Sequence, residues 1–345
     1  ISNLLDLMNE NNFNVDLLIG SNKVEKNFLL SKKYRTFTLG NNFLIKLIRL
    51  FKIINKYDIV HIHSFWTIFI LKVILVSFLL RKKIILTPHG MLTETSCSVR
   101  KIKSYLVPFV NLIIKKISLF HFLTRREYKD TIKYLKVKNL DRFIIQANWI
   151  KTKDISINQT KKLFENNKFN IVFLGRVHPV KNILLQVELI YKLKLNNINA
   201  KLFIIGPKFD KDYYRFLKQK IDHFNINNMI TFLGPIYDDN KFNYLAGADA
   251  CLMTSKFECN SIAALEIMQA GGILIATKQC SLSDANKYGA IKEVNPNLND
   301  LFKSIFDLIK DKNKGFIIRR KAKLFVEEFH SSESALKSFR KIYNI

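Results

Sequence analysis

The chain has 345 residues, of which 48% are hydrophobic and 24% charged, and this balance is typical of a globular protein rather than a disordered one. At this length two domains are expected. Lysine and arginine number 56 against 28 acids, a net charge of +28 that favours phosphorylated substrates, anionic lipid or nucleic acid as partners. No nucleic-acid partner is predicted, because there is no aromatic-basic RNA motif, zinc-ligand spacing or helix-turn-helix pattern.

The amino-terminal part alternates predicted helices with short apolar strands. The expected elements are a helix at the start of the chain, helices at 43–55, 65–80 and 100–117, and strands at 15–19, 59–62, 83–87, 119–123 and 143–146. Because the chain begins on a helix, we expect this α/β domain to lack its first strand and the glycine turn that follows it.

Two apolar segments bear on membrane association. Residues 65–80 carry Lys72 in their middle and fall short of the roughly 20 residues of a spanning helix, so a buried helix is expected. Residues 100–117 place apolar side chains at helical spacing between basic ones. Such a helix can lie on an anionic membrane, or it can pack on the sheet with its lysines in water. The sequence leaves both interpretations open.

His89 follows the strand that ends at Thr87 and precedes Gly90. In a parallel sheet the carboxyl ends of the strands share one edge, where sites assemble, so this imidazole can reach a ligand. A lone histidine is more often structural, and from the residues alone both roles stay open.

The four cysteines show no metal-ligand spacing, and no carboxylate cluster favours a cation, so no metal site is predicted. Cys251 and Cys280 stand in apolar contexts and are expected to be small core residues.

The carboxy-terminal part restarts after a polar stretch, residues 151–168, that reads as a linker. The expected elements are strands at 171–174, 200–205, 229–233 and 250–254, and helices at 183–195, 213–223, 239–246 and 261–270. This alternation predicts a doubly wound parallel sheet in each half. The expected organisation is a domain at 1–150, the linker, a second domain at 169–315, and helices at 316–345 that pack back toward the first domain.

A glycine turn with two cations follows the strand 171–174. Gly175 permits a tight turn, and Arg176 and Lys181 stand between it and the next helix. Arginine binds phosphate oxygens bidentately and lysine adds a point charge, so the arrangement suits a pyrophosphate. It is not a P-loop, because the required glycine and Lys-Ser/Thr spacing is missing.

Two acids, Glu258 and Glu266, lie on either side of a predicted strand-to-helix turn at Asn260 and Ser261. The free backbone N–H groups of a helix start favour an anion such as phosphate, while carboxylates accept hydrogen bonds from sugar and ribose hydroxyls. The plain alternative is that Glu258 caps the helix and Glu266 is an ordinary solvated residue.

Seven segments in order make the chain resemble the retaining, nucleotide-sugar-dependent glycosyltransferases with two facing Rossmann-like domains, the GT-B architecture of glycogen synthase-like and bacterial surface-polysaccharide enzymes. They are YDIVHIHS, TPHGML, FLTRREYKD, FLGRVHPVKN, FIIGP, ITFLGPI and TSKFECNSIAALEIMQAGG. In two places the chain departs from the family's pattern: Cys259, Asn260 and Ser261 replace a Gly-Phe-Gly type of loop, and Asn182 replaces a glycine.

The resemblance implies a role for each matching residue. Arg176 and Lys181 would stabilise the leaving diphosphate, Glu258 would contact the donor sugar and Glu266 the ribose. Asn260 and Ser261 would present backbone N–H groups to phosphate, with Gly175 in the same cradle, and His89 would face the donor sugar.

The implied reaction transfers a sugar with retention of configuration, without a metal or other cofactor, from a UDP- or GDP-linked donor. The expected acceptor is a saccharide or lipid-linked saccharide of capsule, lipopolysaccharide or exopolysaccharide synthesis, in the cytoplasm or at the inner face of the membrane. A nucleotide-sugar epimerase and a catalytically degenerate binding partner are the alternatives.

Overall fold

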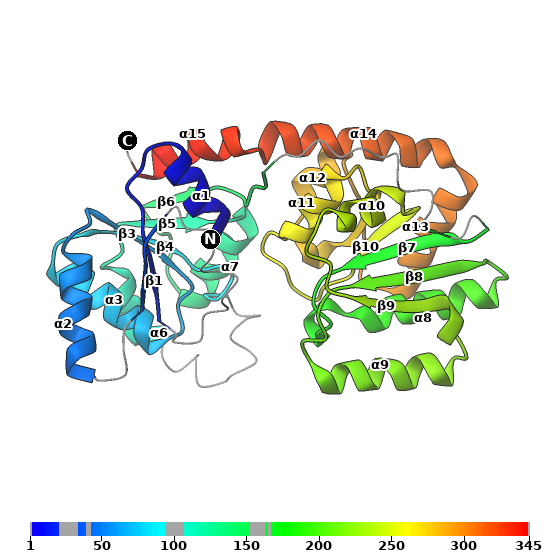
Figure 1. Cartoon of the computed structure of the whole chain (residues 1–345), viewed down its shortest axis with the longest axis horizontal. Coiled ribbons are helices and arrows are strands. Elements are labelled where there is room, and N and C mark those ends of the chain that lie inside the picture. Colours follow the sequence, from blue (N-terminus) through cyan, green and yellow to red (C-terminus); the bar gives the residue numbers. More distant parts are fainter. Residues whose placement is uncertain are drawn as a thin grey trace. The chain divides into compact units, whose positions relative to one another are not determined.

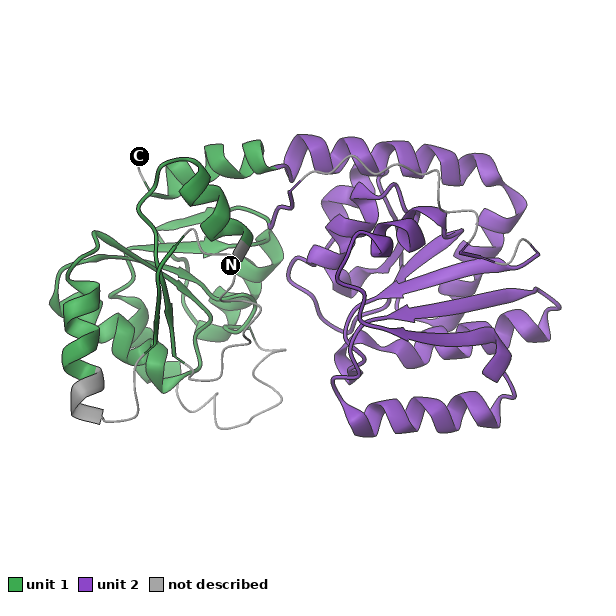
Figure 2. Ribbon diagram, in the orientation of Figure 1, with its two compact units in different colours: residues 1–147, 332–345 green, residues 148–331 purple. Residues whose placement is uncertain are grey.

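The computed structural model describes residues 2–20, 34–38, 43–93, 107–151, 163–164 and 167–343. The chain forms two compact units, which Figure 2 colours separately. Unit 1 contains residues 1–147 and 332–345, and unit 2 contains residues 148–331.

Unit 1 is built on a parallel sheet (Figure 1). Its four strands lie in the order β3 (Ile59–His63), β4 (Lys83–Thr87), β5 (Leu119–Phe122) and β6 (Phe143–Ile145). The connections carry the helices α3 (Ile68–Leu79), α6 (Val107–Ile114) and α7 (Arg125–Leu135). Because each strand pairs with the next one in the chain and such crossovers are right-handed, these three helices cover the same face of the sheet.

The remaining elements of unit 1 come from both ends of the chain. They are the pair β1 (Leu17–Ile19) and β2 (Thr36–Thr38) and the helices α1 (Ser2–Glu10), α2 (Phe43–Ile54) and α15 (Ser332–Tyr343). Helix α2 packs on α3, and α1 contacts α15.

Unit 2 has six parallel strands in the order β12, β11, β10, β7, β8, β9. Their bounds are β7 (Phe169–Leu174), β8 (Ala200–Ile205), β9 (Ile230–Gly234), β10 (Ala250–Met253), β11 (Leu274–Thr277) and β12 (Lys292–Val294). Read from β9 in order of appearance, this is the 3-2-1-4-5-6 order of a doubly wound dinucleotide-binding sheet. The strand order reverses between β7 and β10, which pair side by side.

The helices of unit 2 alternate with its strands. They are α8 (Ile183–Leu195), α9 (Lys211–His223), α10 (Asn240–Gly247), α11 (Ile262–Gln269), α12 (Ser283–Tyr288), α13 (Leu298–Lys310) and α14 (Lys312–Phe329). Every residue of β10 and β11 is buried, as expected for central strands covered on both faces. The α/β fold class predicted from the alternation is therefore confirmed. Both Cys251 and Cys280 are fully buried, as predicted.

Residues 316–345, which the sequence groups into one module, are divided between the units. Helix α14 buries Ala322, Phe325 and Val326 and packs on α11, whereas α15 belongs to unit 1. Most of the predicted linker lies outside the described residues. Among the described helices, none combines the length and apolar character needed to cross a membrane.

Arg319 on α14 holds together two backbone turns of unit 2. Its guanidinium donates to the carbonyls of Ala246 and Gly271 at 2.7 and 2.8 Å and to that of Ala248 at 2.5 Å. Burial lowers the pKa of this guanidinium. The side chain thus supplies the donors that the end of α10 and the turn before β11 lack.

We expect Arg319→Met to destabilise unit 2 by about 3 to 5 kcal/mol, because three buried carbonyls lose their donor. Urea unfolding followed by the fluorescence of Trp149, in a Trp66→Phe background, measures this loss. The matched control is Arg320→Met, whose side chain is exposed on the same helix. Equal effects of the two substitutions would show that the carbonyl contacts are dispensable.

Candidate functional site

The loops after β7 and β10 meet where the strand order of unit 2 reverses. Residues 175–182 follow β7 and residues 254–261 follow β10. The backbone N–H of Lys256 donates to the carbonyl of Val180 at 2.8 Å and so joins the two loops. In open α/β sheets, ligands bind outside the carboxyl ends of the strands at such a reversal.

Gly175 and Gly206 allow the turns after β7 and β8 to approach closely. A Cβ atom on Gly206 would lie 1.9 Å from the carbonyl oxygen of Gly175. Only glycine fits there, so the first turn of the candidate site is formed by backbone. Further along this loop, Asn182 has a φ of 51°, a conformation that asparagine tolerates better than most residues. This explains how asparagine can stand where the family has glycine.

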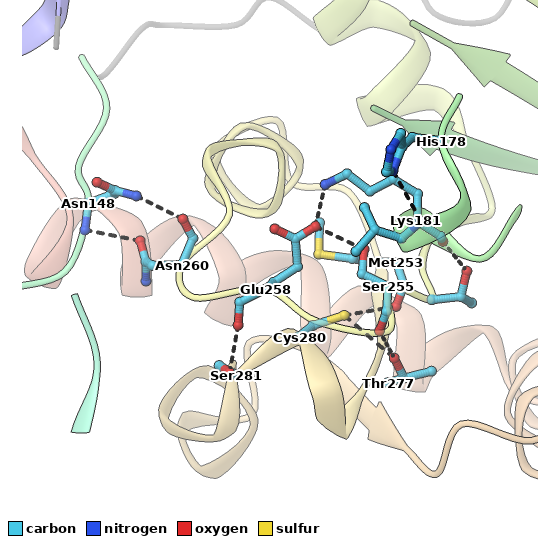
Figure 3. A network of polar contacts seen from close by, with 12 residues as sticks. Asn148, His178, Lys181, Met253, Ser255, Glu258, Asn260, Thr277, Cys280 and Ser281 are labelled. Carbon is cyan, nitrogen blue, oxygen red and sulfur yellow. Dashed lines mark hydrogen bonds and ion pairs between the residues drawn. The ribbon is translucent and has the colours of Figure 1, made fainter. Parts of the chain in front are cut away.

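Lys181 and Glu258 form an ion pair across the two loops (Figure 3). Their side chains are only 14% and 16% exposed. The hydroxyl of Ser255 donates to the same carboxylate oxygen at 2.9 Å. Glu258 therefore does not cap the next helix, and its charge is matched by a cation from the other loop.

The loop that carries Glu258 is fixed by backbone and side-chain contacts on both sides. Thr254 Oγ1 donates to the carbonyls of Lys181 and Asn182, each at 3.1 Å. The hydroxyl of Ser281 donates to the carbonyl of Glu258 at 2.8 Å. Below the loop, burial raises the pKa of Cys280 to about 11, so this thiol stays protonated and serves packing.

Asn260 and Ser261 lie at the start of α11. The Asn260 side chain accepts from the backbone N–H of Asn148 at 3.0 Å, and its carbonyl accepts from the Asn148 amide at 2.7 Å. Ser261 is the N-cap residue of α11, but its side chain makes no capping hydrogen bond. The serine thus leaves the first N–H groups of the helix available to an anion.

Glu266 lies one turn into α11 and pairs with Lys241 of α10 at 2.7 Å. Both side chains are mostly buried, with 16% of Lys241 and 21% of Glu266 exposed. Glu266 is therefore not an ordinary solvated helix residue. Lys241 was not predicted, because a lone lysine on a predicted helix gives no signal of its own.

Arg176 projects into solvent beside Phe209. Its guanidinium carbon lies 4.6 Å from the centre of the Phe209 ring, and His178 contacts the edge of the same ring. Among the described residues the cation is held by stacking and has no acidic partner, which leaves its N–H groups able to bind an anion.

His89 belongs to unit 1, where a backbone φ of 51° and two neighbours position it. His63 Nδ1 lies 2.9 Å from His89 Nε2, so one ring donates to the other. The carboxylate of Glu127 accepts from the N–H groups of Gly90 and Leu123 at 2.5 and 2.7 Å and so ties the turn to β5. Burial lowers the pKa of His89 to about 4, which keeps this imidazole neutral at pH 7.

A directed chain of hydrogen bonds runs beside His89. The Gln146 carbonyl can only accept, so His121 carries its proton on Nε2, 2.9 Å away, and accepts at Nδ1 from Thr87. Thr87 in turn accepts from His61 Nε2 at 2.8 Å. His61 is neutral because burial lowers its pKa well below the ordinary value, and its Nδ1 accepts from the Tyr343 hydroxyl at 2.8 Å.

Of the predicted site residues, the structure brings Lys181 and Glu258 into contact and places Gly175 on the same pair of loops. Arg176, Asn260 and Ser261 lie on these loops as well, and Glu266 lies on α11, where it pairs with Lys241. His89 lies in the other unit. In the part of the chain that the structure describes, no group of three or more His, Cys, Asp or Glu side chains is placed to hold a metal ion.

The chain has two units, each built on a parallel sheet. In unit 2 the strand order is doubly wound, and a loop with basic residues meets a loop with an acidic residue where that order reverses. Together these features define a protein of the GT-B fold. HepE from Anabaena, solved with UDP and glucose, matches with a TM-score of 0.83 at 16% identity, over 99% of this chain and 95% of that one.

The family model for glycosyl transferases group 1 matches residues 154–325, and this match together with the GT-B fold supports membership of the family. A 41.2 kDa protein of the cps region of Klebsiella pneumoniae, itself uncharacterized, is 24% identical over 268 residues, 74% of this chain and 70% of that protein. The GPI3 subunit of phosphatidylinositol N-acetylglucosaminyltransferase from Saccharomyces cerevisiae is 23% identical, over 88% of this chain and 63% of its own length.

Proposed function

We propose that this group 1 glycosyltransferase moves a sugar from a UDP- or GDP-linked donor to a saccharide or lipid-linked acceptor in bacterial surface-polysaccharide synthesis. The observation that carries the proposal is the Lys181 and Glu258 pair, where the strand order of unit 2 reverses. The donor class is supported by the UDP and glucose bound to HepE, and the pathway by the cps-region relative.

The proposed roles follow from the charge and position of each group. Lys181 and Arg176 bind the donor diphosphate, one as a partly buried point charge and the other as an exposed fork. The N–H groups of α11 after Asn260 and Ser261 add the dipole of a helix start. Glu258 accepts from hydroxyls of the donor sugar. Glu266, oriented by Lys241, accepts from those of the ribose.

The reaction breaks the bond between the anomeric carbon and the diphosphate oxygen. An acceptor hydroxyl oxygen then bonds to the same face of that carbon, so configuration is retained, and its proton passes to the departing phosphate. The cations and the helix start stabilise the charge that develops on the diphosphate, which is electrostatic catalysis by fixed groups. Because protein groups supply this stabilisation, we propose a metal-independent transfer with no cofactor. We also propose for His89 the role that the family resemblance implies, which is to face the donor sugar.

A thermal-shift screen of UDP, GDP, ADP, CMP and their sugar derivatives tests the donor site. A ligand present at 100 times its dissociation constant should stabilise the protein by about 2.7 kcal/mol. We expect one nucleotide class to raise the melting temperature, and this rise to be lost in Lys181→Ala and Glu266→Ala.

The control is Lys256→Ala, because Lys256 is exposed on the same loop as Glu258. If no nucleotide stabilises the wild type, or if the control loses the shift as well, the proposed donor site is wrong. Chromatography of the products then separates transfer from epimerisation, since an epimerase changes the donor sugar without an acceptor.

A further inference from the structure

The helices over one face of the unit 1 sheet expose large apolar side chains. On α3, Ile68, Leu75 and Leu79 are 74%, 58% and 58% exposed, and their spacing places them along one side of the helix. On α6, Phe109 and Leu112 are 54% and 59% exposed. These side chains face solvent although the opposite sides of both helices are buried in the core.

The two exposed rows adjoin each other. The ammonium of Lys116, two residues after the end of α6, lies 3.9 Å from the centre of the Phe78 ring on α3. We call this set the apolar patch: Ile68, Leu75, Phe78, Leu79, Phe109 and Leu112. Contiguous apolar patches that are exposed to solvent mark an interaction site.

Cations border the patch on the side of α7, which contacts α6. We call this set the basic rim: Lys115, Lys116, Arg125, Arg126, Lys129, Lys133 and Lys136. The helices α3 and α6 contain no acidic residue. On α7 itself the two acids are Glu127, which is buried, and Asp130, which lies 3.6 Å from Arg126, so the cations outnumber the acids on this helix.

We propose that the apolar patch and the basic rim dock unit 1 onto a membrane surface that contains anionic lipids. Apolar side chains on outward helix faces can enter the boundary between headgroups and acyl chains, while neighbouring lysines contact the headgroups. Each cation near such a surface raises affinity about fivefold. A protein partner is disfavoured, because lysine is depleted from protein interfaces.

The apolar patch and the basic rim lie on unit 1, so lipid binding by them does not depend on the donor site of unit 2. Co-sedimentation of the full chain with vesicles tests it, using phosphatidylcholine alone and phosphatidylcholine mixed with phosphatidylglycerol. We expect binding to the mixed vesicles, little binding to the neutral ones, and weaker binding as salt concentration rises.

Two double variants separate the apolar and the charged contributions. Leu75→Ser with Leu79→Ser, and Lys129→Glu with Lys133→Glu, should each lower vesicle affinity roughly tenfold or more. The matched controls in unit 2 are Leu195→Ser with Phe316→Ser, at side chains 63% and 70% exposed, and Lys211→Glu with Lys303→Glu. Melting temperatures show whether each variant folds.

Three results would overturn the proposal. The first is a wild type that fails to bind mixed vesicles at low salt. The second is a loss of binding in the unit 2 controls that is as large as in the patch variants. The third is a dimer in size-exclusion chromatography that the Leu75→Ser and Leu79→Ser variant dissociates, because the patch would then join two copies of the chain. Loss of binding in the patch variants with unchanged melting would support it.

Discussion

Replacement of Lys181 by Ala is expected to lower kcat/KM for the donor by about 10²- to 10³-fold, the cost of removing one charged group that stabilises a developing anion. The loss has two sources. The diphosphate loses a partly buried cation, and Glu258 is left with an unmatched negative charge beside it. Steady-state kinetics with the donor identified by thermal shift measures the effect.

A second substitution at the same pair gives a result in the opposite direction. Glu258→Gln keeps a group that can accept from Ser255 but frees Lys181 from its ion pair. We expect free nucleoside diphosphate to bind roughly tenfold more tightly to this variant, because bound phosphate no longer competes with a carboxylate for the lysine. Sugar transfer should fall in the same variant.

The exposed Lys256 is again the control, since Lys256→Ala should change neither quantity by more than about twofold. Equal losses in Lys181→Ala and Lys256→Ala would contradict the role given to Lys181. Weaker diphosphate binding in Glu258→Gln would show that the pair does not compete with the ligand.

Acidification is expected to destabilise unit 1 more than unit 2, where burial lowers the pKa of one histidine, His330. Burial lowers the pKa values of His89 and His121 to about 4, whereas the unfolded chain binds these protons near the ordinary value of about 6.5. Their contribution to stability is therefore complete above pH 6.5 and is lost as the pH falls toward 4. At pH 5 the loss is about 2 kcal/mol for each such histidine.

Urea unfolding at pH 7.5 and pH 5.0 measures this loss in unit 1, through Trp66 fluorescence in a Trp149→Phe background. His121→Gln should remove part of the pH dependence, whereas His223→Gln, at an exposed position in unit 2, should not. A pH dependence that is unchanged in His121→Gln would show that the buried histidine chain does not set the acid limit.

The elements of unit 2 from β7 to α11 could be predicted closely from the sequence, because buried parallel strands and amphipathic helices alternate there with clear glycine turns. The strand β12 and the helices α12 and α13 that follow were not predicted. The predicted helix 183–195 and strand 200–205 have the observed bounds of α8 and β8. The helix α7 was missed because most of its residues are charged or polar. A signal was present: Thr124 and Glu127 have the spacing of a capping box, and Thr124 does accept from the Glu127 N–H at 3.1 Å.

The predicted helix 100–117 is described only from Val107 onward, where α6 begins. Val110 and Ile114 are buried in the core, as packing on the sheet requires, while Phe109 and Leu112 are exposed, and the membrane interpretation stays a prediction. Periodicity alone could not separate the two, because both sides of this helix are apolar.

Within the site, the sequence predicted single groups but not their partners. The contact between Lys181 and Glu258 depends on which strands are neighbours in the sheet, and spacing along the chain does not contain that information. The pairing of Glu266 with Lys241 and the histidine contacts of unit 1 depend on the same long-range packing.

The division of unit 1 between the two ends of the chain affects its synthesis. The Tyr343 hydroxyl and the Phe339 ring contact His61 and His121, so the buried histidine chain is complete only when α15 has docked. A ribosome makes every residue of unit 2 before it makes α15. Unit 2 can therefore fold during translation, whereas the first 147 residues must wait for the last part of the chain before their interior is closed. A fragment that ends before Ser332 would leave the His61 imidazole without its tyrosine donor.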